Sequence, residues 1–202
     1  MANCMFEVTV SNSVRNQVQN VTGKYGTGTG TGFTAQACPA GRLVVQNGLL
    51  PLEGYEDYKL LNGNAWYFND AASGIVVGAT GDHTGIFACN TYNVNRVSDG
   101  ENAWNLGART LGLTVPADER TDFTELYVGE QYTFGVDNFT AKPDDITTNK
   151  YATIANGQWT ATNTAPTDGG VYAQIMRTKP VNEGTSFWGD GYVLKILRSA
   201  KA

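Results

Sequence analysis

Short apolar runs separated by turns that contain glycine and asparagine make up most of this chain. Asn47-Gly48 stands between two apolar runs in RLVVQNGLLPL, Asn62-Gly63 in YKLLNGNAWYF, and Asn156-Gly157 in KYATIANGQWTAT. Asn-Gly tolerates the positive φ angles of a type I′ turn, so each pair predicts a two-residue β-hairpin. A fourth hairpin is predicted in ELYVGEQYTFGV, where Gly129-Glu130 suits a type II′ turn.

Further runs that are typical of strands lie between these turns, namely GIVVG, GIFACNTY, TLGLTV, VYAQIMR and GYVLKILRS. Near the N-terminus, Phe6, Val8 and Val10 alternate as they would in a strand. The next stretch, VSNSVRNQVQNV, keeps a helical spacing of valines, but we interpret it as extended because valine, asparagine and serine are poor helix formers. The sequence therefore predicts an all-β protein of antiparallel hairpins, with one or two small β-sandwich or barrel units and an extended N-terminal arm.

A faint internal repeat indicates two related β units. Phe33 and Phe139 each begin a Phe-Thr-Ala triplet, and an Asn-Gly pair follows each triplet. Between them, Pro116 and a cluster of charges interrupt the strand pattern over Thr114 to Asp122, which is typical of a boundary. We expect an N-terminal arm with a Gly/Thr joint at residues 1–32, a first β unit at residues 33–118 and a second at residues 119–202.

The run YGTGTGTGF, from Tyr25 to Phe33, raises the question of a phosphate-binding loop. A dinucleotide fingerprint needs glycines in the pattern G-x-G-x-x-G between a strand and a helix, but here the glycines alternate strictly and threonine occupies position 31. No Gly-Lys-Thr/Ser follows, and Pro39 interrupts the chain before a helix could run. We interpret the run as a flexible or extended joint between arm and body.

Composition agrees with a strand-rich chain, because 24 Gly, 24 Thr and 18 Asn stand against 14 Lys plus Arg. The formal net charge is −5 and no basic stretch is interleaved with aromatics, so we expect no direct binding of nucleic acid. The sequence has neither a secretory signal pattern nor an apolar run long enough to span a bilayer, which predicts a product that is made in the cytoplasm and is soluble there. Only 16% of residues are charged, so we expect much of the surface to contact other protein.

The residues that could carry chemistry form no recognisable catalytic or metal-binding set. The three cysteines are widely spaced and are expected to be reduced, buried small hydrophobes. The only histidine lies among turn residues, and no G-x-S-x-G elbow or calcium loop is present. The clustered acids are interpreted as solvated loop charge, unless the fold brings two of them together as a glycosidase needs. We therefore expect a non-enzyme without cofactor or metal. The residues considered for catalysis or metal binding are Cys4, Cys38, Cys89, His83, Glu53, Glu56, Asp57, Asp118, Glu119, Asp144 and Asp145.

The end of the chain carries a resemblance to a known group of proteins. KYATIANGQWTATNTAPTDGGVYAQIMRTKPVNEGTSFWGDGYVLKIL resembles the closing β unit of tailed-bacteriophage head (capsid) decoration proteins, where a hairpin, a Thr-Ala-Pro-Thr loop and a last pair of strands recur. GFTAQACPAGRLVVQNG, EGYEDY and NGNAWYFNDA are similar to the same group. The resemblance implies a non-enzymatic virion structural protein that binds the capsid surface, decorates or reinforces the phage head, and is made in the host bacterial cytoplasm.

Such a protein needs a rigid β body and often an arm that crosses neighbouring subunits. FEVTV could add to a partner's sheet edge by main-chain hydrogen bonds, and docking at many sites of a lattice would raise avidity. We expect the partners to be the major capsid protein lattice and further copies of this chain, for example in a trimer. The expected interaction residues are Phe6, Val8, Val10, Tyr25, Gly28, Gly30 and Phe33.

The tryptophans leave a second function open. In strands they usually belong to the core, but two or three exposed on one face would make a sugar-binding platform. The alternative is therefore a glycan- or receptor-binding β module of a phage fibre or tail, or of a surface adhesin. The four candidates are Trp66, Trp104, Trp159 and Trp188.

Overall fold

The expected all-β class is confirmed. A computed structural model describes residues 4–10, 20–28, 32–49, 66–75, 85–90, 96–98, 103–105, 114–117, 119–183 and 186–199, and structural statements refer to these ranges. Within them the chain forms β-strands and the 3-10 turn η4 (Val136–Asn138), and no α-helix. Accordingly, this part of the chain contains no helix with the length and apolar character needed to cross a bilayer.

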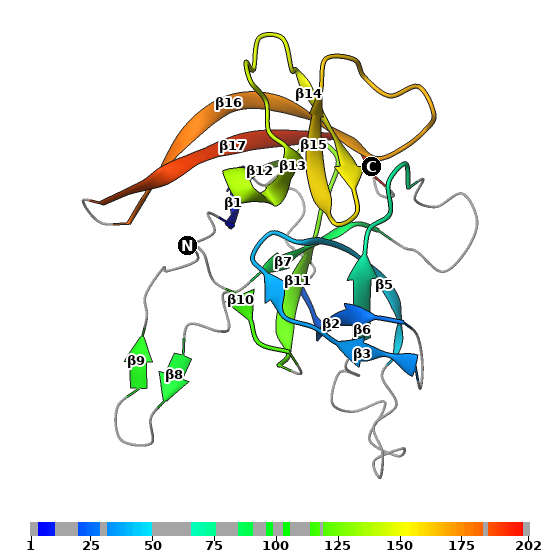
Figure 1. The fold of residues 1–202 in the computed structure, drawn as a ribbon, viewed down its shortest axis with the longest axis vertical. Helices are drawn as coiled ribbons and strands as arrows, with labels where there is room; N and C mark the ends of the chain where they lie inside the picture. Colours follow the sequence, from blue (N-terminus) through cyan, green and yellow to red (C-terminus); the bar gives the residue numbers. More distant parts are fainter. Residues whose placement is uncertain are drawn as a thin grey trace.

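Five strands close into a barrel, which occupies the lower half of Figure 1. They are β2 (Asn20–Thr27), β5 (Leu43–Leu49), β6 (Trp66–Asp70), β7 (Phe87–Asn90) and β11 (Thr121–Glu125). The ring runs β2, β11, β7, β5, β6 and back to β2, and every neighbouring pair is antiparallel except β2 with β6. A short strand, β3 (Thr34–Ala35), adds to β2. Closure leaves these five strands without the open edges of a flat sheet.

The second large element is a seven-stranded sheet, which lies above the barrel in Figure 1. Its strands are β1 (Phe6–Val10), β12 (Gln131–Gly135), β13 (Phe139–Ala141), β14 (Tyr151–Ala155), β15 (Gln158–Thr162), β16 (Tyr172–Glu183) and β17 (Ser186–Arg198). They are arranged in the order β1-β12-β17-β16-β14-β15-β13, antiparallel except for β13 with β15. Two small pairs complete the described strands, β4 (Cys38–Pro39) with β10 (Thr114–Val115) and β8 (Arg96–Ser98) with β9 (Ala103–Asn105).

The barrel and the sheet share an apolar core. Inside the barrel, Val44 packs with Phe68 and Phe123, whose rings stack with centroids 4.0 Å apart. Its neighbours Leu43 and Val45 belong to a larger cluster that also contains the buried side chains of the seven-stranded sheet. Because successive side chains of a strand point to opposite faces, β5 contributes to both cores. The outer wall of the barrel is therefore buried against the sheet.

The predicted hairpin at Asn156-Gly157 is confirmed, and its turn docks on the barrel. Ala155 pairs with Gln158, and the two turn residues have positive φ angles of 48° and 77°, as a type I′ turn requires. The Leu43 N–H donates to the Gly157 carbonyl at 2.8 Å, and the Gly157 N–H donates to the Ala71 carbonyl at 2.9 Å. These two hydrogen bonds join the β14–β15 hairpin to barrel backbone.

Two other predicted hairpins are wrong. Asn47-Gly48 lies inside β5, which continues to Leu49 with a register shift against β6, so the one extra residue is taken up as a bulge. Gly129-Glu130 belongs to a turn in which the Glu130 N–H donates to the Tyr127 carbonyl at 3.3 Å. That turn joins β11 of the barrel to β12 of the sheet, so the flanking strands are not paired with each other. Asn62-Gly63 lies outside the described residues.

The expected arm and unit boundaries also need correction. The described parts of residues 1–32 are strands of the body, because β1 pairs with β12 and β2 pairs with both β6 and β11. The barrel includes β11, which lies beyond the expected boundary at residue 118, and the chain crosses to the sheet at residues 126–130. Strand partners this distant in sequence leave no local pattern, which is why the division into consecutive units was wrong.

Candidate functional site

The interaction residues expected from the sequence do not gather on one surface. Phe6 is buried in the shared core, with its ring stacked on Tyr132 at a centroid distance of 5.6 Å. Tyr25 is buried in the barrel, and its hydroxyl donates to Asp70 Oδ1 at 2.8 Å. Asp70 also accepts a hydrogen bond from Arg42 Nε at 2.7 Å. Phe6 and Tyr25 therefore hold the body together instead of facing a partner.

Val8 and Val10 lie in β1, the first strand in the order of the seven-stranded sheet. One side of β1 pairs with β12 of the same chain, with Val8 opposite Tyr132 and Val10 opposite Gln131. Among the described strands, none pairs with the other side of β1. The addition of a partner's strand to FEVTV therefore stays a prediction, and it applies only to the side of β1 that does not face β12.

The YGTGTGTGF run does not join an arm to the body. Up to residue 27 it belongs to β2, and its last residues there pair with β3. Gly28 is exposed, and its carbonyl oxygen accepts a hydrogen bond from Asn69 Nδ2 at 3.1 Å. Phe33 is half-buried, with its ring 5.3 Å from that of Tyr67, and Gly30 lies outside the described residues. The described part of the run thus comprises the end of the barrel strand β2 and residues that follow it.

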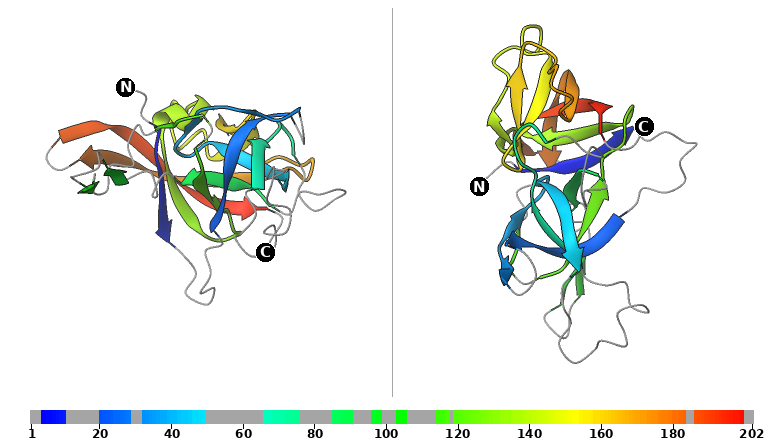
Figure 2. Two further views of the ribbon diagram at one scale, coloured as in Figure 1. Left: turned by 90° about the horizontal axis from the view of Figure 1, so that it is seen from below. Right: turned by 90° about the vertical axis from the view of Figure 1, so that its right-hand side faces the viewer.

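Strands β16 and β17 extend beyond the strands beside them. β14 pairs with β16 only at residues 172–174, and β12 pairs with β17 only at residues 191–195. Farther out, residues 180–183 pair with residues 186–190 and with no other described strand. This outer part is called the β16–β17 ribbon, and its described residues, 180–183 and 186–190, project from the body in Figures 1 and 2. At its base, Lys179 Nζ forms an ion pair with Glu7 Oε2 at 2.6 Å.

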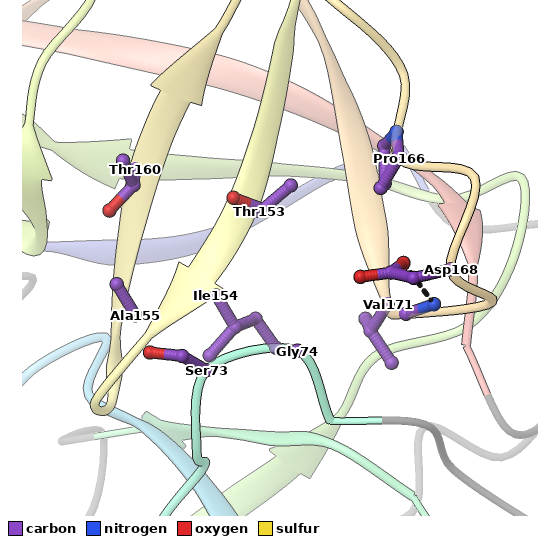
Figure 3. A pocket seen from close by; sticks show the side chains of 10 residues that line it. Ser73, Gly74, Thr153, Ile154, Ala155, Thr160, Pro166, Asp168 and Val171 are labelled. Carbon is purple, nitrogen blue, oxygen red and sulfur yellow. Dashed lines mark hydrogen bonds between the residues drawn. The ribbon is translucent and has the colours of Figure 1, made fainter.

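A pocket of about 280 Å³ lies where three segments meet. It is bounded by the turn Ser73-Gly74 after β6, by β14 and β15, and by the loop at residues 166–171, as Figure 3 shows. Two hydrogen bonds fix the last turn of this loop. The Val171 N–H donates to the Ile75 carbonyl at 3.1 Å, and the Gly170 N–H donates to Asp168 Oδ1 at 2.9 Å. The pocket is therefore shaped by backbone hydrogen bonds before anything binds.

Hydroxyl groups and one carboxylate supply the polar lining of this pocket. Thr153 and Thr160 lie opposite each other on β14 and β15, Ser73 lies on the barrel turn, and Asp168 is the one charged residue of the lining. Thr160 Oγ1 is buried and has no hydrogen-bond partner in the described part of the chain. A buried hydroxyl in that condition costs about 1–3 kcal/mol unless a bound molecule satisfies it.

From the pocket, a row of side chains crosses the outer face of the sheet. Thr153 lies opposite Tyr172, and Tyr172 lies opposite Arg198. The Arg198 guanidinium covers the Tyr172 ring at 4.8 Å from its centroid and donates from Nη1 to the Gly170 carbonyl at 3.3 Å. The Tyr151 ring stands at 64° to that of Tyr172, with centroids 6.0 Å apart. These rings are braced against each other and do not form a flat aromatic platform.

The tryptophans give no support to the expected sugar platform. Trp159 is fully buried in the shared core. Trp66, Trp104 and Trp188 lie in strands, but their side chains are outside the described part of the structure.

Two buried glutamates escaped the sequence analysis. Glu125 and Glu130 are 1% and 3% exposed and flank the turn at which the chain crosses from barrel to sheet. The Tyr127 hydroxyl donates to Glu125 Oε2 at 3.0 Å, and the Tyr132 hydroxyl donates to the Glu130 carboxylate. The repeated Glu-x-Tyr spacing in ELYVGEQY is the signal that could have found them, because residues i and i+2 share one face of an extended chain. Neither lines the pocket, so we assign them a structural role.

The buried tyrosines predict an alkaline limit to stability. Burial, and then the hydrogen bond to Glu130, raises the pKa of Tyr132 well above its usual range, and burial and Asp70 do the same to the pKa of Tyr25. Above about pH 10 the unfolded chain loses phenolic protons that the folded chain keeps, so the free energy of unfolding should fall. Each tyrosine contributes a slope of up to about 1.4 kcal/mol per pH unit.

Urea unfolding between about pH 9 and pH 11 measures this slope. Tyr132→Phe and Tyr25→Phe should each lose stability at pH 8 and show a shallower decline at high pH. A decline in both variants as steep as that of the unaltered chain would contradict the assignment.

The cysteines are buried small hydrophobes, as expected. Cys4, Cys38 and Cys89 are all buried free thiols. Cys38 and Cys89 lie inside the barrel, where burial first and then a hydrogen bond with Cys89 raise the pKa of Cys38. This environment keeps the Cys38 thiol in the unreactive protonated form at neutral pH.

The acidic candidates are not brought together by the described fold. Glu119, Asp144 and Asp145 are exposed, as expected of loop charge. Asp168 is the only carboxylate among the pocket lining, so the pair that a glycosidase needs is not assembled there. Within the described ranges, no three His, Cys, Asp or Glu side chains lie close enough to hold a metal ion. His83, Glu53, Glu56, Asp57 and Asp118 lie outside those ranges.

No family model, curated protein or solved structure matches this chain.

Proposed function

We propose that the chain is a non-enzymatic structural protein of a bacteriophage head, which binds the major capsid protein lattice and decorates or reinforces the shell. The observation that carries this proposal is the β16–β17 ribbon, whose two strands project past every described neighbour. The ribbon lies within the C-terminal stretch that resembles the closing β unit of head-decoration proteins. The contact element in this proposal is thus the C-terminal ribbon, and strand addition at the outer edge of β1 stays a separate prediction.

A two-stranded ribbon has a physical reason to seek a protein partner. An isolated β-hairpin is marginally stable in water, and a third strand gives independent stability. A strand of the shell can supply it by main-chain hydrogen bonds along the outer edge of the ribbon. The body holds the base of the ribbon through the pairing of β12 and β14 and through the Lys179–Glu7 ion pair. On a lattice with many equal sites, modest contacts of this kind suffice for stable decoration.

A truncated variant tests the ribbon without disturbing the body. Residues 180–190 are replaced by Asn-Gly, so that Lys179 and Gly191, which face each other, are joined by the same kind of turn as Ala155 and Gln158. Purified heads that lack the protein are mixed with each chain and sedimented. We expect the complete chain to bind in many copies and the truncated chain to bind at least about tenfold more weakly.

Thermal unfolding of the truncated variant checks that its body still folds. As a binding control, Thr167→Ala changes an exposed loop residue at the other end of β16 and should bind as the unaltered chain does. Unchanged binding of the truncated chain would remove the ribbon as the contact, and absence of the chain from purified particles would remove the proposed function. Self-association, for example as a trimer, stays a prediction that light scattering of both chains measures.

A further inference from the structure

Two of the three thiol groups lie next to each other inside the barrel. Cys38 in β4 and Cys89 in β7 both belong to the apolar core of the barrel, and both are buried. Their side chains share a hydrogen bond, so the two sulfur atoms are neighbours. Cys4 belongs to neither apolar cluster of the described residues. The pair has no part in attachment through the ribbon, which is built from other strands.

The backbone holds the segment after Cys38 against Cys89. The chain turns directly after Cys38, where the Arg42 N–H donates to the Pro39 carbonyl at 3.2 Å. The Gly41 N–H donates to the Cys89 carbonyl, and the Cys89 N–H donates to the Arg42 carbonyl, both at 2.9 Å. A disulfide requires two side chains that point toward each other, and side chains that share a hydrogen bond already do so. The bond can therefore form without a change in the pairing of the barrel strands.

Of the two cysteines, Cys38 lies in the part of the barrel that opens more easily. In the described structure β4 and β10 pair at only two positions, Thr114 with Pro39 and Val115 with Cys38. Cys89 lies in β7, which pairs with β11 on one side and with β5 on the other. A short, separate strand pair opens at a lower free-energy cost than strands of a closed ring. Separation of β4 from β10 therefore exposes the Cys38 thiol to solvent while β7 stays in place.

We propose that Cys38 and Cys89 form a redox-sensitive pair, which hydrogen peroxide converts into a disulfide that fastens β4 to β7. In the opened form the Cys38 thiolate attacks one peroxide oxygen, the O–O bond breaks, and the leaving hydroxide takes the thiol proton to form water. Cys38 is then a sulfenic acid. When β4 closes, the Cys89 sulfur attacks the Cys38 sulfur, the S–O bond breaks, and the leaving hydroxide takes the Cys89 proton to form a second water. The two thiols thus give two electrons to one peroxide molecule.

The disulfide acts as a clasp on the barrel. It joins β4, which two residue pairs hold to β10, to a strand of the closed ring, and it bridges the chain from residue 38 to residue 89. A cross-link across a segment of this length restricts the unfolded chain and so stabilises the folded one. We expect the melting temperature of the oxidised chain to rise by about 5–15 °C. Reducing surroundings keep the thiols free, so the clasp forms only where an oxidant is present.

Thiol counting on the purified full chain tests the proposal. The chain is treated with hydrogen peroxide, the excess is destroyed with catalase, and the remaining thiols are labelled with a maleimide in urea. We expect the count to fall from three to one, and dithiothreitol to restore it. Peptide mapping should find Cys38 linked to Cys89 within one chain. Oxidation of the exposed Met176 in the same map shows that the peroxide treatment was effective.

Three alanine variants assign the pair. Cys38→Ala and Cys89→Ala should each form no disulfide within the chain, and peroxide should not raise their melting temperatures. Cys4→Ala replaces another buried thiol and should still form the bond and show the full rise. Thermal unfolding under reducing conditions checks that each variant folds. These measurements need no phage heads, so their failure leaves the proposed function untouched.

Three outcomes overturn the proposal. One is a count of three thiols after Met176 has been oxidised. Another is a peptide map in which the disulfide involves Cys4, or joins two chains, in place of the link between Cys38 and Cys89. The third is a linked chain that melts no higher than the reduced chain, since the bond would then not fasten β4 to the barrel.

Discussion

Gly157→Ala is expected to lower the free energy of unfolding by at least about 3 kcal/mol. Gly157 has a φ of 77°, where a side chain alone costs about 1–2 kcal/mol. An alanine Cβ would also lie 2.6 Å from Arg42 Nε and in hard contact with Asp70 Oδ1. To make room, the hairpin must move off Leu43 and Ala71 or the part-buried Arg42–Asp70 ion pair must break, and either movement loses hydrogen bonds.

Gly129→Ala is the matched control for this effect. Gly129 has a similar φ of 89°, but a Cβ there would meet nothing within 4 Å. We therefore expect it to cost only the backbone strain of about 1–2 kcal/mol. Urea unfolding of the two variants measures the difference, which reports the docking of the hairpin on the barrel. Equal costs at the two positions would show that this docking contributes nothing to stability.

The features predicted correctly from the sequence are those decided by neighbouring residues. Asn156-Gly157 forms the expected turn because both residues accept positive φ and the strands on either side pair with each other. GIFACNTY contains β7, and VYAQIMR and GYVLKILRS form parts of β16 and β17. The reason is of the same kind, since a run of apolar and β-branched residues favours extension wherever it lies. The all-β class followed from many such local preferences acting together.

The same Asn-Gly signal gave a wrong prediction at residues 47–48, where the pairing of the barrel strands determines the course of the chain. Asn47-Gly48 offered the same local signal, yet β5 has to reach Leu49 to complete its pairing with β6, and the chain absorbs the pair as a bulge. β1 looked like a free arm because its partner, β12, lies more than a hundred residues away. Local propensity indicates that a segment is extended, whereas the partner strand depends on which apolar faces can be buried together.

The pocket could not be foreseen for a related reason. It combines a barrel turn, a hairpin and a loop, and its polar residues are ordinary for their elements. Thr160 reads as a typical strand residue and Asp168 as a typical turn residue. Only the fold brings the barrel turn Ser73-Gly74 next to β14, β15 and the loop that carries Asp168.

The second large effect is expected at Asn138, a buried side chain that joins three segments. Its Oδ1 accepts hydrogen bonds from the Met5 N–H at 2.8 Å and the Gly135 N–H at 3.0 Å, and its Nδ2 donates to the Ala40 carbonyl at 2.7 Å. Asn138→Ala leaves buried backbone groups without these partners, each at a cost of about 1–3 kcal/mol, so we expect a loss of about 3 kcal/mol or more. Urea unfolding measures it. The control is Asn149→Ala, which removes a single exposed hydrogen bond, from the Asp144 N–H to Asn149 Oδ1.

Asn138→Asp tests the hydrogen-bond donor of this side chain separately from its acceptor. The carboxylate keeps an acceptor for Met5 and Gly135 but faces the Ala40 carbonyl without a proton to donate, whereas the protonated acid restores the donor. Burial then raises the pKa of this aspartate in the folded state above its unfolded value of about 3.9. The stabilisation by the protonated carboxyl group is fully present below that value and is lost as the pH rises through the folded pKa. As the pH is lowered from 8 to 4, the free energy of unfolding of this variant should therefore rise relative to that of the unaltered chain. If Asn138→Asp shows no such gain, the donor to Ala40 is not what makes Asn138 necessary, and the bonds to the N-terminal strand and to η4 must carry its contribution.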